Sequence, residues 1–230
     1  MDRRRIEAVI FDLDDTLFDC TGQLTEPARR RAAETLATAI PDSDASALHS
    51  IQAKLAGQLS SADAIREIAR RHELSADNVE SALTAYNRDH VEDIMPFPDT
   101  LSTLDELAAR KYGLCLVTTG RRERQRRKVD RLGLCSHFSE ASGTLVFHDD
   151  REFPEKDEAL QRAALRFNLA PCRILSVGDK LNSEIAASKR LGMRTARLCF
   201  GRQKNQRPRT REERPDHELN RLKDLLELLP

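Results

Sequence analysis

The sequence has few aromatic residues, no long hydrophobic run and no excess of charge of either sign. It contains no Trp, two Tyr and eight Phe among 230 residues, too few to offer a stacking surface for single-stranded nucleic acid. Lys plus Arg and Asp plus Glu each total 38, so no overall field attracts nucleic acid or an anionic membrane. No apolar run approaches the roughly 20 residues that cross a bilayer. Any recognition of an anion must therefore be local.

Cysteine spacing and the N-terminus exclude further classes. The five cysteines show neither CxxC nor CxxH spacing, which argues against a structural zinc site or a disulfide framework. Cys115 and Cys199 lie within apolar runs, and we expect them to be small buried hydrophobic side chains. Residues 1–5 lead into a short strand rather than into the apolar region of a signal peptide. We therefore expect a soluble, cytoplasmic protein with no membrane and no nucleic-acid partner.

Short apolar runs alternate with segments of helical apolar spacing, a pattern that predicts a doubly wound α/β fold with a parallel, Rossmann-like sheet. The runs expected to be buried strands are Ala8–Phe11, Leu114–Val117, Ile174–Val177 and Thr195–Leu198. Residues 144–147 could be extended as well. The expected helices outside the insertion described next include 99–110, 121–132 and a final helix at about 218–229. The polar, Arg-rich segment 201–215 predicts an exposed, mobile loop.

The first and second apolar runs are separated by roughly 100 residues, far more than a crossover connection requires. From Pro27 to about Asp93 the sequence is Ala-rich, with apolar residues at three- and four-residue spacings, which predicts four helices. Ser or Asp at the breaks 41–43, 57–61 and 74–77 can cap the helices that follow. We expect an all-helical domain, residues 21–95, inserted into a core domain of residues 1–20 and 96–230.

The first apolar run ends in alternate carboxylates and a threonine, Asp12, Asp14 and Thr16. Burying several carboxylates at the end of a strand without a partner would cost several kcal/mol, so the cluster indicates a site for a hard cation. A turn in which Asp bonds its own backbone is the alternative. The form Asp-x-Asp-x-Thr after an apolar strand resembles the first motif of the haloacid dehalogenase-like hydrolase superfamily.

Three later segments resemble the other motifs of this superfamily in the correct order. Thr118, Thr119 and Gly120 follow the second strand, although the family often has Asn at the position of Thr119. Lys156 precedes a helix, with Asp157 in place of the usual proline.

Gly178, Asp179 and Glu184 resemble the last motif of the family. Glu184 stands where the family has a second Asp. Asp179 follows an apolar strand, so its carboxylate can face the same sheet edge as Asp12. The longer side chain of Glu184 could reach a metal-bound water or Lys156.

The resemblance implies a magnesium-dependent phosphohydrolase of subclass I, with a helical C1 cap and a small phosphorylated metabolite as substrate. It implies that Asp12 attacks phosphorus and binds Mg²⁺, that Thr118 and Lys156 stabilise the phosphoryl group, and that Asp179 is a further metal ligand. The catalytic residues would be Asp12, Asp14, Thr118 and Lys156; the substrate-binding residues Thr118, Thr119, Gly120 and Lys156; the metal ligands Asp12, Asp179 and the main-chain carbonyl of Asp14; and the supporting residues Thr16, Gly178 and Glu184.

The carboxyl of Asp14 is left free to protonate a leaving alcohol and then to activate water. Haloacid dehalogenases lack an Asp two positions after the nucleophile, so Asp14 favours phosphoryl chemistry. By this argument Asp15 takes neither the part of the nucleophile nor that of the proton carrier. A phosphomutase on the same core remains an alternative, and so does a non-catalytic phosphate-binding regulatory protein. The sequence does not indicate the specific substrate or the oligomeric state.

The remaining charged residues lack such patterns. We expect the basic run Arg121–Lys128 to form a solvated helix face. We expect His72, His90 and His148, which lack metal-ligand spacing, to lie at the surface.

Overall fold

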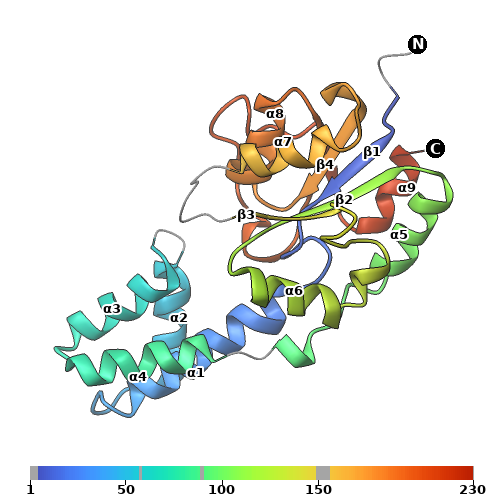
Figure 1. The fold of residues 1–230 in the computed structure, drawn as a ribbon. Helices are drawn as coiled ribbons and strands as arrows, with labels where there is room; N and C mark the ends of the chain where they lie inside the picture. Colours follow the sequence, from blue (N-terminus) through green and yellow to red (C-terminus); the bar gives the residue numbers. More distant parts are fainter. Residues whose placement is uncertain (1–4, 57–58, 89–90, 149–155, 230) are drawn as a thin grey trace. The chain divides into compact units, whose positions relative to one another are not determined.

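The computed structural model describes residues 5–56, 59–88, 91–148 and 156–229. By its internal contacts the chain divides into two compact units, Met1–Thr21 with Val91–Pro230, and Gly22–His90 (Figure 1). The expected boundaries, after residues 20 and 95, lie one and five residues from these divisions. Within the described ranges no helix is both long enough and apolar enough to cross a membrane.

The first unit contains a six-stranded parallel sheet in the order β3-β2-β1-β4-β5-β6. The chain moves outward from β1 in one direction through β2 and β3, and in the other through β4, β5 and β6. The predicted doubly wound α/β core with a helical insertion is therefore confirmed. The strands are β1 Ala8–Phe11, β2 Gly113–Thr119, β3 Leu145–His148, β4 Ile174–Gly178, β5 Arg194–Leu198 and β6 His217–Leu219.

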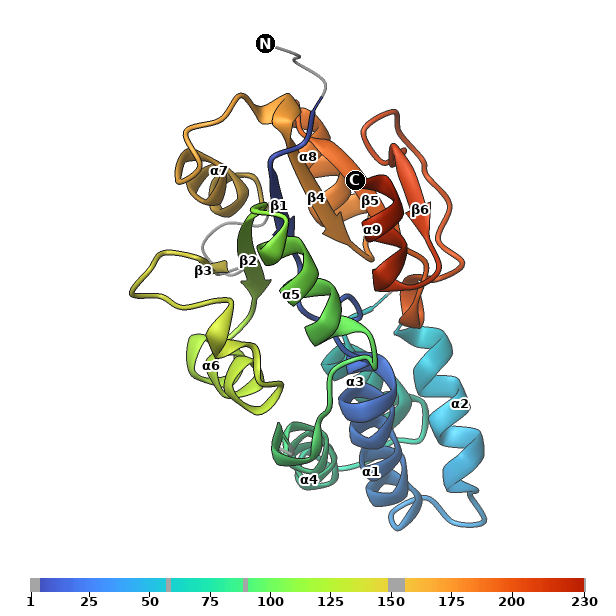
Figure 2. The ribbon, with the colours of Figure 1, turned by 90° about the vertical axis from the view of Figure 1, so that its right-hand side faces the viewer.

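Helices cover both faces of this sheet. The helices of this unit are α5 Thr100–Ala109, α6 Arg122–Arg131, α7 Asp157–Leu165, α8 Ala186–Arg190 and α9 Leu225–Leu228. Ile10 and Cys115 pack in one hydrophobic cluster with Leu160 of α7 and Ala187 of α8. Because side chains alternate along a strand, Phe11 points to the opposite face, where its ring meets the edge of Phe138 at 6.3 Å between centroids. Figure 2 shows α5 and α9 side by side along the sheet.

The C-terminal segment differs from the sequence-based prediction. The expected helix at 218–229 is wrong in its first half, because His217–Leu219 forms the edge strand β6 and a 3-10 turn follows at Leu222–Asp224. Only Leu225–Leu228 is α-helical. A three-residue strand is too short to show an alternating pattern of its own, and its apolar Leu219 also fits the spacing of a helix.

The loop that follows β5 is anchored more firmly than its composition predicts. Arg197 of β5 is buried, and its guanidinium donates to the main-chain carbonyls of Gln203, Lys204 and Gln206. The side chain of Gln206 in turn accepts a hydrogen bond from the Leu181 N–H at 3.0 Å. Most of the arginines of this loop are exposed, as expected.

The regular elements of the second unit are all helices in the residues that the structure describes. It consists of α1 Glu26–Ala37, α2 Ala45–Leu55, α3 Ser61–Arg71 and α4 Ala76–Asn87. Asp44, Ser60 and Ser75 cap the last three helices, each accepting hydrogen bonds from main-chain N–H groups of the first turn. A compact apolar core that includes Leu36 and Ile65 holds the four helices together. The four predicted helices are thus present, and residues 57–58 of the second predicted break lie outside the described residues.

The cysteine predictions are confirmed for Cys115 and wrong for Cys199. Cys115 is buried in the sheet, and burial raises the pKa of its thiol to about 12. Cys199 is only partly buried, because it follows the last residue of β5, where the sheet gives way to the loop.

Candidate active site

The predicted site residues gather at the carboxyl ends of three neighbouring strands. Asp12 follows β1, Thr118 and Thr119 end β2, and Asp179 follows β4. Since β1 lies between β2 and β4, these residues meet where the strand order reverses, the position at which open α/β sheets bind ligands. The N–H of Asp12 donates to the carbonyl of Val177 in β4 at 2.8 Å. This bond holds the start of the loop after β1 against the end of β4.

These strand ends surround a polar cavity of about 320 Å³. Seven of the residues predicted for the site line it. Gly120, Thr16 and Gly178 do not. The lining residues are Asp12, Asp14, Asp15, Thr118, Thr119, His148, Lys156, Asp179, Lys180, Ser183, Glu184 and Arg202.

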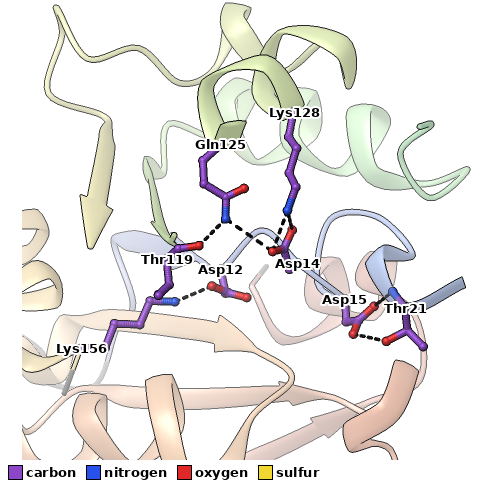
Figure 3. Close-up of polar contacts among 8 residues, drawn as sticks. All are labelled: Asp12, Asp14, Asp15, Thr21, Thr119, Gln125, Lys128 and Lys156. Atoms are coloured by element: carbon purple, nitrogen blue, oxygen red, sulfur yellow. Dashed lines mark hydrogen bonds and ion pairs between the residues drawn. The ribbon is translucent and has the colours of Figure 1, made fainter. Parts of the chain in front are cut away.

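Lys156 and Asp12 lie side by side on the wall of this cavity. Lys156 precedes α7, is 3% exposed, and its ammonium group donates to Oδ1 of Asp12 (Figure 3). Although burial acts against the charged form, Asp12 and Glu184 raise the pKa of Lys156. Burial raises the pKa of Asp12 to about 6, against the lowering effect of Lys156. A solvated surface lysine, the alternative to a site residue, is therefore excluded.

Three carboxylates form a cluster suited to a cation. Asp12, Asp179 and Glu184 each offer an oxygen, and these oxygens lie within 4.8 Å of one another. Neither carboxylate oxygen of Asp179 has a hydrogen-bond partner among the described residues, although the side chain is buried. Burial, followed by the charges of Glu184 and Asp12, raises the pKa of Asp179 to about 9. Buried, unpartnered oxygen ligands of like charge fit a hard divalent cation.

Glu184 takes a larger part in this cluster than its position in the motif predicted. Its Oε1 accepts a hydrogen bond from the Lys180 N–H at 2.5 Å, and its Oε2 lies 3.9 Å from the Nζ of Lys156. The side chain is thereby held between the last loop and the lysine. The longer residue still reaches the cluster, so the replacement of Asp by Glu preserves the acidic set.

The carboxylate of Asp14 lies outside the acidic cluster and faces α6 instead. Lys128 Nζ is 2.8 and 2.9 Å from its two oxygens, and Gln125 Nε2 is 3.5 Å from Oδ2 (Figure 3). Burial alone would raise the pKa of Asp14, but Lys128 and Gln125 outweigh it and lower the pKa below its usual value. Asp14 is therefore ionised at neutral pH in this arrangement.

The prediction of a solvated basic face at Arg121–Lys128 is wrong for two residues. Gln125 and Lys128 are each 3% exposed, whereas the arginines of this run are exposed. The reason is the helical period: Gln125 and Lys128 share one face of α6 with the buried Val129, and that face turns toward the first loop.

The carboxylate of Asp15 makes hydrogen bonds that stabilise the loop. It accepts hydrogen bonds from the N–H and the hydroxyl of Thr21, at 2.7 and 2.6 Å (Figure 3). The residue adopts a left-handed backbone conformation with φ of 60°, which Asp tolerates better than most residues. These bonds hold the turn after Asp14 closed.

Two further residues differ from expectation. His148, predicted to lie at the surface, is 4% exposed at the end of β3 and lines the cavity, because β3 pairs with β2 at Thr119. Thr16 is fully buried beneath the loop rather than facing the cavity. His72 is exposed, as predicted, and His90 lies outside the described residues.

Sequence comparison identifies the family. A family model described as haloacid dehalogenase-like hydrolase matches residues 9–198. The chain belongs to this family. The resemblance inferred from the four motifs is thus confirmed, and seven of the motif residues line the strand-end cavity of this hydrolase.

Relatives of this hydrolase are named as phosphatases. The chain is 29% identical to a glyceraldehyde 3-phosphate phosphatase of Methanopyrus kandleri, with 97% of each chain covered. It is 28% identical to the pyrophosphatase PpaX of Bacillus velezensis, covering 99% of this chain and 98% of the relative. The fold is similar to that of a predicted phosphoglycolate phosphatase from Haemophilus somnus, with a TM-score of 0.71, 20% identity and full coverage of both chains. The predicted enzyme class, a phosphatase, agrees with the names of the curated relatives.

Proposed function

We propose that this hydrolase is a magnesium-dependent phosphatase that cleaves a small phosphomonoester through an aspartyl-phosphate at Asp12. The observation that carries the proposal is the pairing of Asp12 with the buried Lys156, beside two further carboxylates, on the wall of a polar cavity. A carboxylate so placed can meet a phosphoryl group while a fixed cation offsets the repulsion between the two anions.

The donor set favours magnesium. Asp12, Asp179 and Glu184 supply hard oxygen ligands, and Mg²⁺ is usually held by one or two carboxylates together with water and substrate phosphate. Asp12 and Asp179 would hold the ion by their side chains, with Glu184 beside them and the main-chain carbonyl of Asp14 as a further ligand. When bound, the ion supplies positive charge that stabilises the developing charge on the phosphoryl oxygens.

The protein's own groups then divide the work. Asp12 attacks phosphorus, and the bond to the leaving oxygen breaks; Lys156 and the hydroxyl of Thr118 stabilise charge on the phosphoryl oxygens. Water next attacks the aspartyl-phosphate, its proton passes to Asp14, and the bond between Asp12 and phosphorus breaks. The ion pair with Lys128 keeps Asp14 in the form that accepts this proton. The proton that Asp14 accepts from water in this step is the one that it can donate to the leaving oxygen of the next substrate.

The relatives indicate where to look for the substrate. Their names point to glyceraldehyde 3-phosphate and to pyrophosphate, both small phosphoryl compounds. We propose a substrate of this size. We also propose that the helical insertion, residues 21–95, acts as the cap domain.

The test is a magnesium-dependent assay of phosphate release across sugar phosphates, nucleotides, short-chain phosphates including glyceraldehyde 3-phosphate, phospho-acids and pyrophosphate. Steady release of inorganic phosphate without an isomeric product would support the phosphatase over a mutase. Borohydride reduction of the enzyme during turnover should convert residue 12 to homoserine. Asp12→Asn should abolish turnover with the fold retained, whereas Asp105→Asn, an exposed acid on α5, should not. Turnover by Asp12→Asn at the wild-type rate would disprove the nucleophile.

A further inference from the structure

Lys128 is buried, and among the described residues the carboxylate that pairs with its ammonium group is that of Asp14, the proposed proton carrier. Its side chain is 4% exposed, while that of Asp14 is 31% exposed and opens to the cavity. The ammonium lies at 2.8 and 2.9 Å from both carboxylate oxygens. Burying an ammonium group is costly unless it is paired. The pair is therefore a built feature of this site rather than a chance surface contact.

Two neighbouring residues restrict the orientations of the Asp14 carboxylate and the Lys128 ammonium group. Gln125, one turn earlier on α6, donates both to Oδ2 of Asp14 at 3.5 Å and to the main-chain carbonyl of Thr119 (Figure 3). The ring of Phe18, fully buried, lies 5.7 Å from the Lys128 ammonium, within reach of a cation–π interaction. The carboxylate of Asp14 is thus held from one side by α6 and left open on the other.

The other cations of α6 do not share this environment. Arg122 and Arg126 pair with Glu140 at the surface. Arg131, at the end of the helix, is exposed. Lys128 alone among the basic residues of α6 lies on the buried face with Gln125 and Val129.

We propose that Lys128 is a positioning residue for Asp14, which it holds ready to accept a proton from the water that hydrolyses the aspartyl-phosphate. The inference rests on the proposed function of Asp12 and Asp14. In this step a bond forms between the water oxygen and phosphorus, the bond between Asp12 and phosphorus breaks, and the water proton moves to Asp14. Lys128 neither gives nor takes a proton; it fixes the carboxylate that does.

The role has a kinetic signature. A substrate with a good leaving group, such as p-nitrophenyl phosphate, needs little help to release its alcohol, so kcat/KM reports the attack by Asp12. A loosely held Asp14 would slow only the second step. We expect Lys128→Met to lower kcat about ten- to a hundredfold, part of the 10²- to 10⁴-fold typical of acid–base groups. KM should fall with kcat, leaving kcat/KM unchanged, and a burst of p-nitrophenol should precede the slow phase.

The controls separate positioning from folding. Arg131→Met, on the same helix but exposed, should leave all parameters at their wild-type values. Asp14→Asn should show the same burst, and Lys128→Met should cause no further loss in that background, because a residue that acts through another is not additive with it. Lys128→Gln, which keeps a donor without the charge, replaces Lys128→Met if that variant does not fold.

The outcomes distinguish the two proposals. Absence of hydrolysis or of a phosphoenzyme in the wild type would overturn the proposed function itself. If the wild type and Asp14→Asn behave as described, but Lys128→Met lowers kcat and kcat/KM equally or changes neither, the positioning role is wrong. An additive loss in the Asp14→Asn background would overturn it as well.

Discussion

The side chain of Glu184 packs directly against the backbone of Gly178, and this contact is possible only because residue 178 has no side chain. A Cβ at position 178 would lie 2.3 Å from Cγ of Glu184 and 2.6 Å from its Oε1. Glu184 reaches the carboxylate cluster across the backbone of Gly178. The glycine of the last motif therefore makes room for the acid that follows it in this chain.

Gly178→Ala should destabilise the protein through this contact, by about 1–3 kcal/mol, as overpacked positions do. In the background of Glu184→Ala, which removes the crowded atoms, the same substitution should cost almost nothing. Urea denaturation of the four proteins of this double-mutant cycle gives the coupling. An equal cost of Gly178→Ala in both backgrounds would mean that Glu184 is not the neighbour that matters.

Magnesium should stabilise the wild-type fold by binding to the carboxylate cluster. A ligand present at a hundred times its dissociation constant adds about 2.7 kcal/mol, which a thermal scan with and without Mg²⁺ detects. Asp179→Asn should lose this response. Without metal, near pH 7, that variant should unfold at a higher temperature than the wild type. Burial beside Asp12 and Glu184 raises the pKa of Asp179, so folding costs free energy to neutralise its carboxylate, and Asn carries no such cost. An unchanged magnesium response in Asp179→Asn would place the ion elsewhere.

The strand-end residues could be predicted because each follows an apolar run in the sequence. Asp12, Thr118 and Asp179 needed only the rule that parallel strands bring their carboxyl ends to one edge. Lys128 could not be found in this way, since it lies within a helix whose basic residues resemble a solvated face. A signal did exist: Gln125, Lys128 and Leu132 follow the helical period of the apolar face, and Leu132 is buried.

Sequence spacing cannot predict which charged residues form ion pairs when they are far apart in the chain. Lys128 and Asp14 are separated by 114 residues, and their contact depends on where α6 packs. His148 is a similar case, because its burial depends on β3 pairing with β2. The edge strand β6 could not be predicted for a local reason. Its three residues are too few to show an alternating pattern, and their apolar position also fits a helix.

Thr21→Val should weaken the turn that follows Asp14. The substitution keeps the shape and the N–H bond of Thr21 but removes the hydroxyl that donates to Asp15 at 2.6 Å. Asp15 is 2% exposed, so the loss of this hydrogen bond to a charged group should cost about 1.5–3 kcal/mol in the free energy of unfolding. Thr21→Ser, which retains the hydroxyl, is the matched control. Equal urea midpoints for the Val and Ser variants would contradict the role given to the hydroxyl.

Asp216 should make stability depend on pH. Its carboxylate accepts from the Thr195 N–H at 2.8 Å and lies 2.6 Å from the Lys189 Nζ. Burial opposes the charged form, but Lys189 and Thr195 outweigh it and lower the pKa. A carboxyl whose pKa is lower in the folded state stabilises the fold above its unfolded pKa of about 3.9 and loses this contribution as the pH falls through the folded value.

Asp216→Asn should therefore be less stable than the wild type at pH 7, and the difference should shrink below about pH 4, near the pKa of an unfolded Asp. Urea denaturation of both proteins at pH 7, 5 and 3.5 measures the difference directly. Because Asn keeps an acceptor for the Thr195 N–H, the part that depends on pH reports the charge rather than the hydrogen bond. A difference that stayed constant from pH 7 to 3.5 would show that the ion pair with Lys189 adds nothing, and that only the shape of the side chain matters at this position.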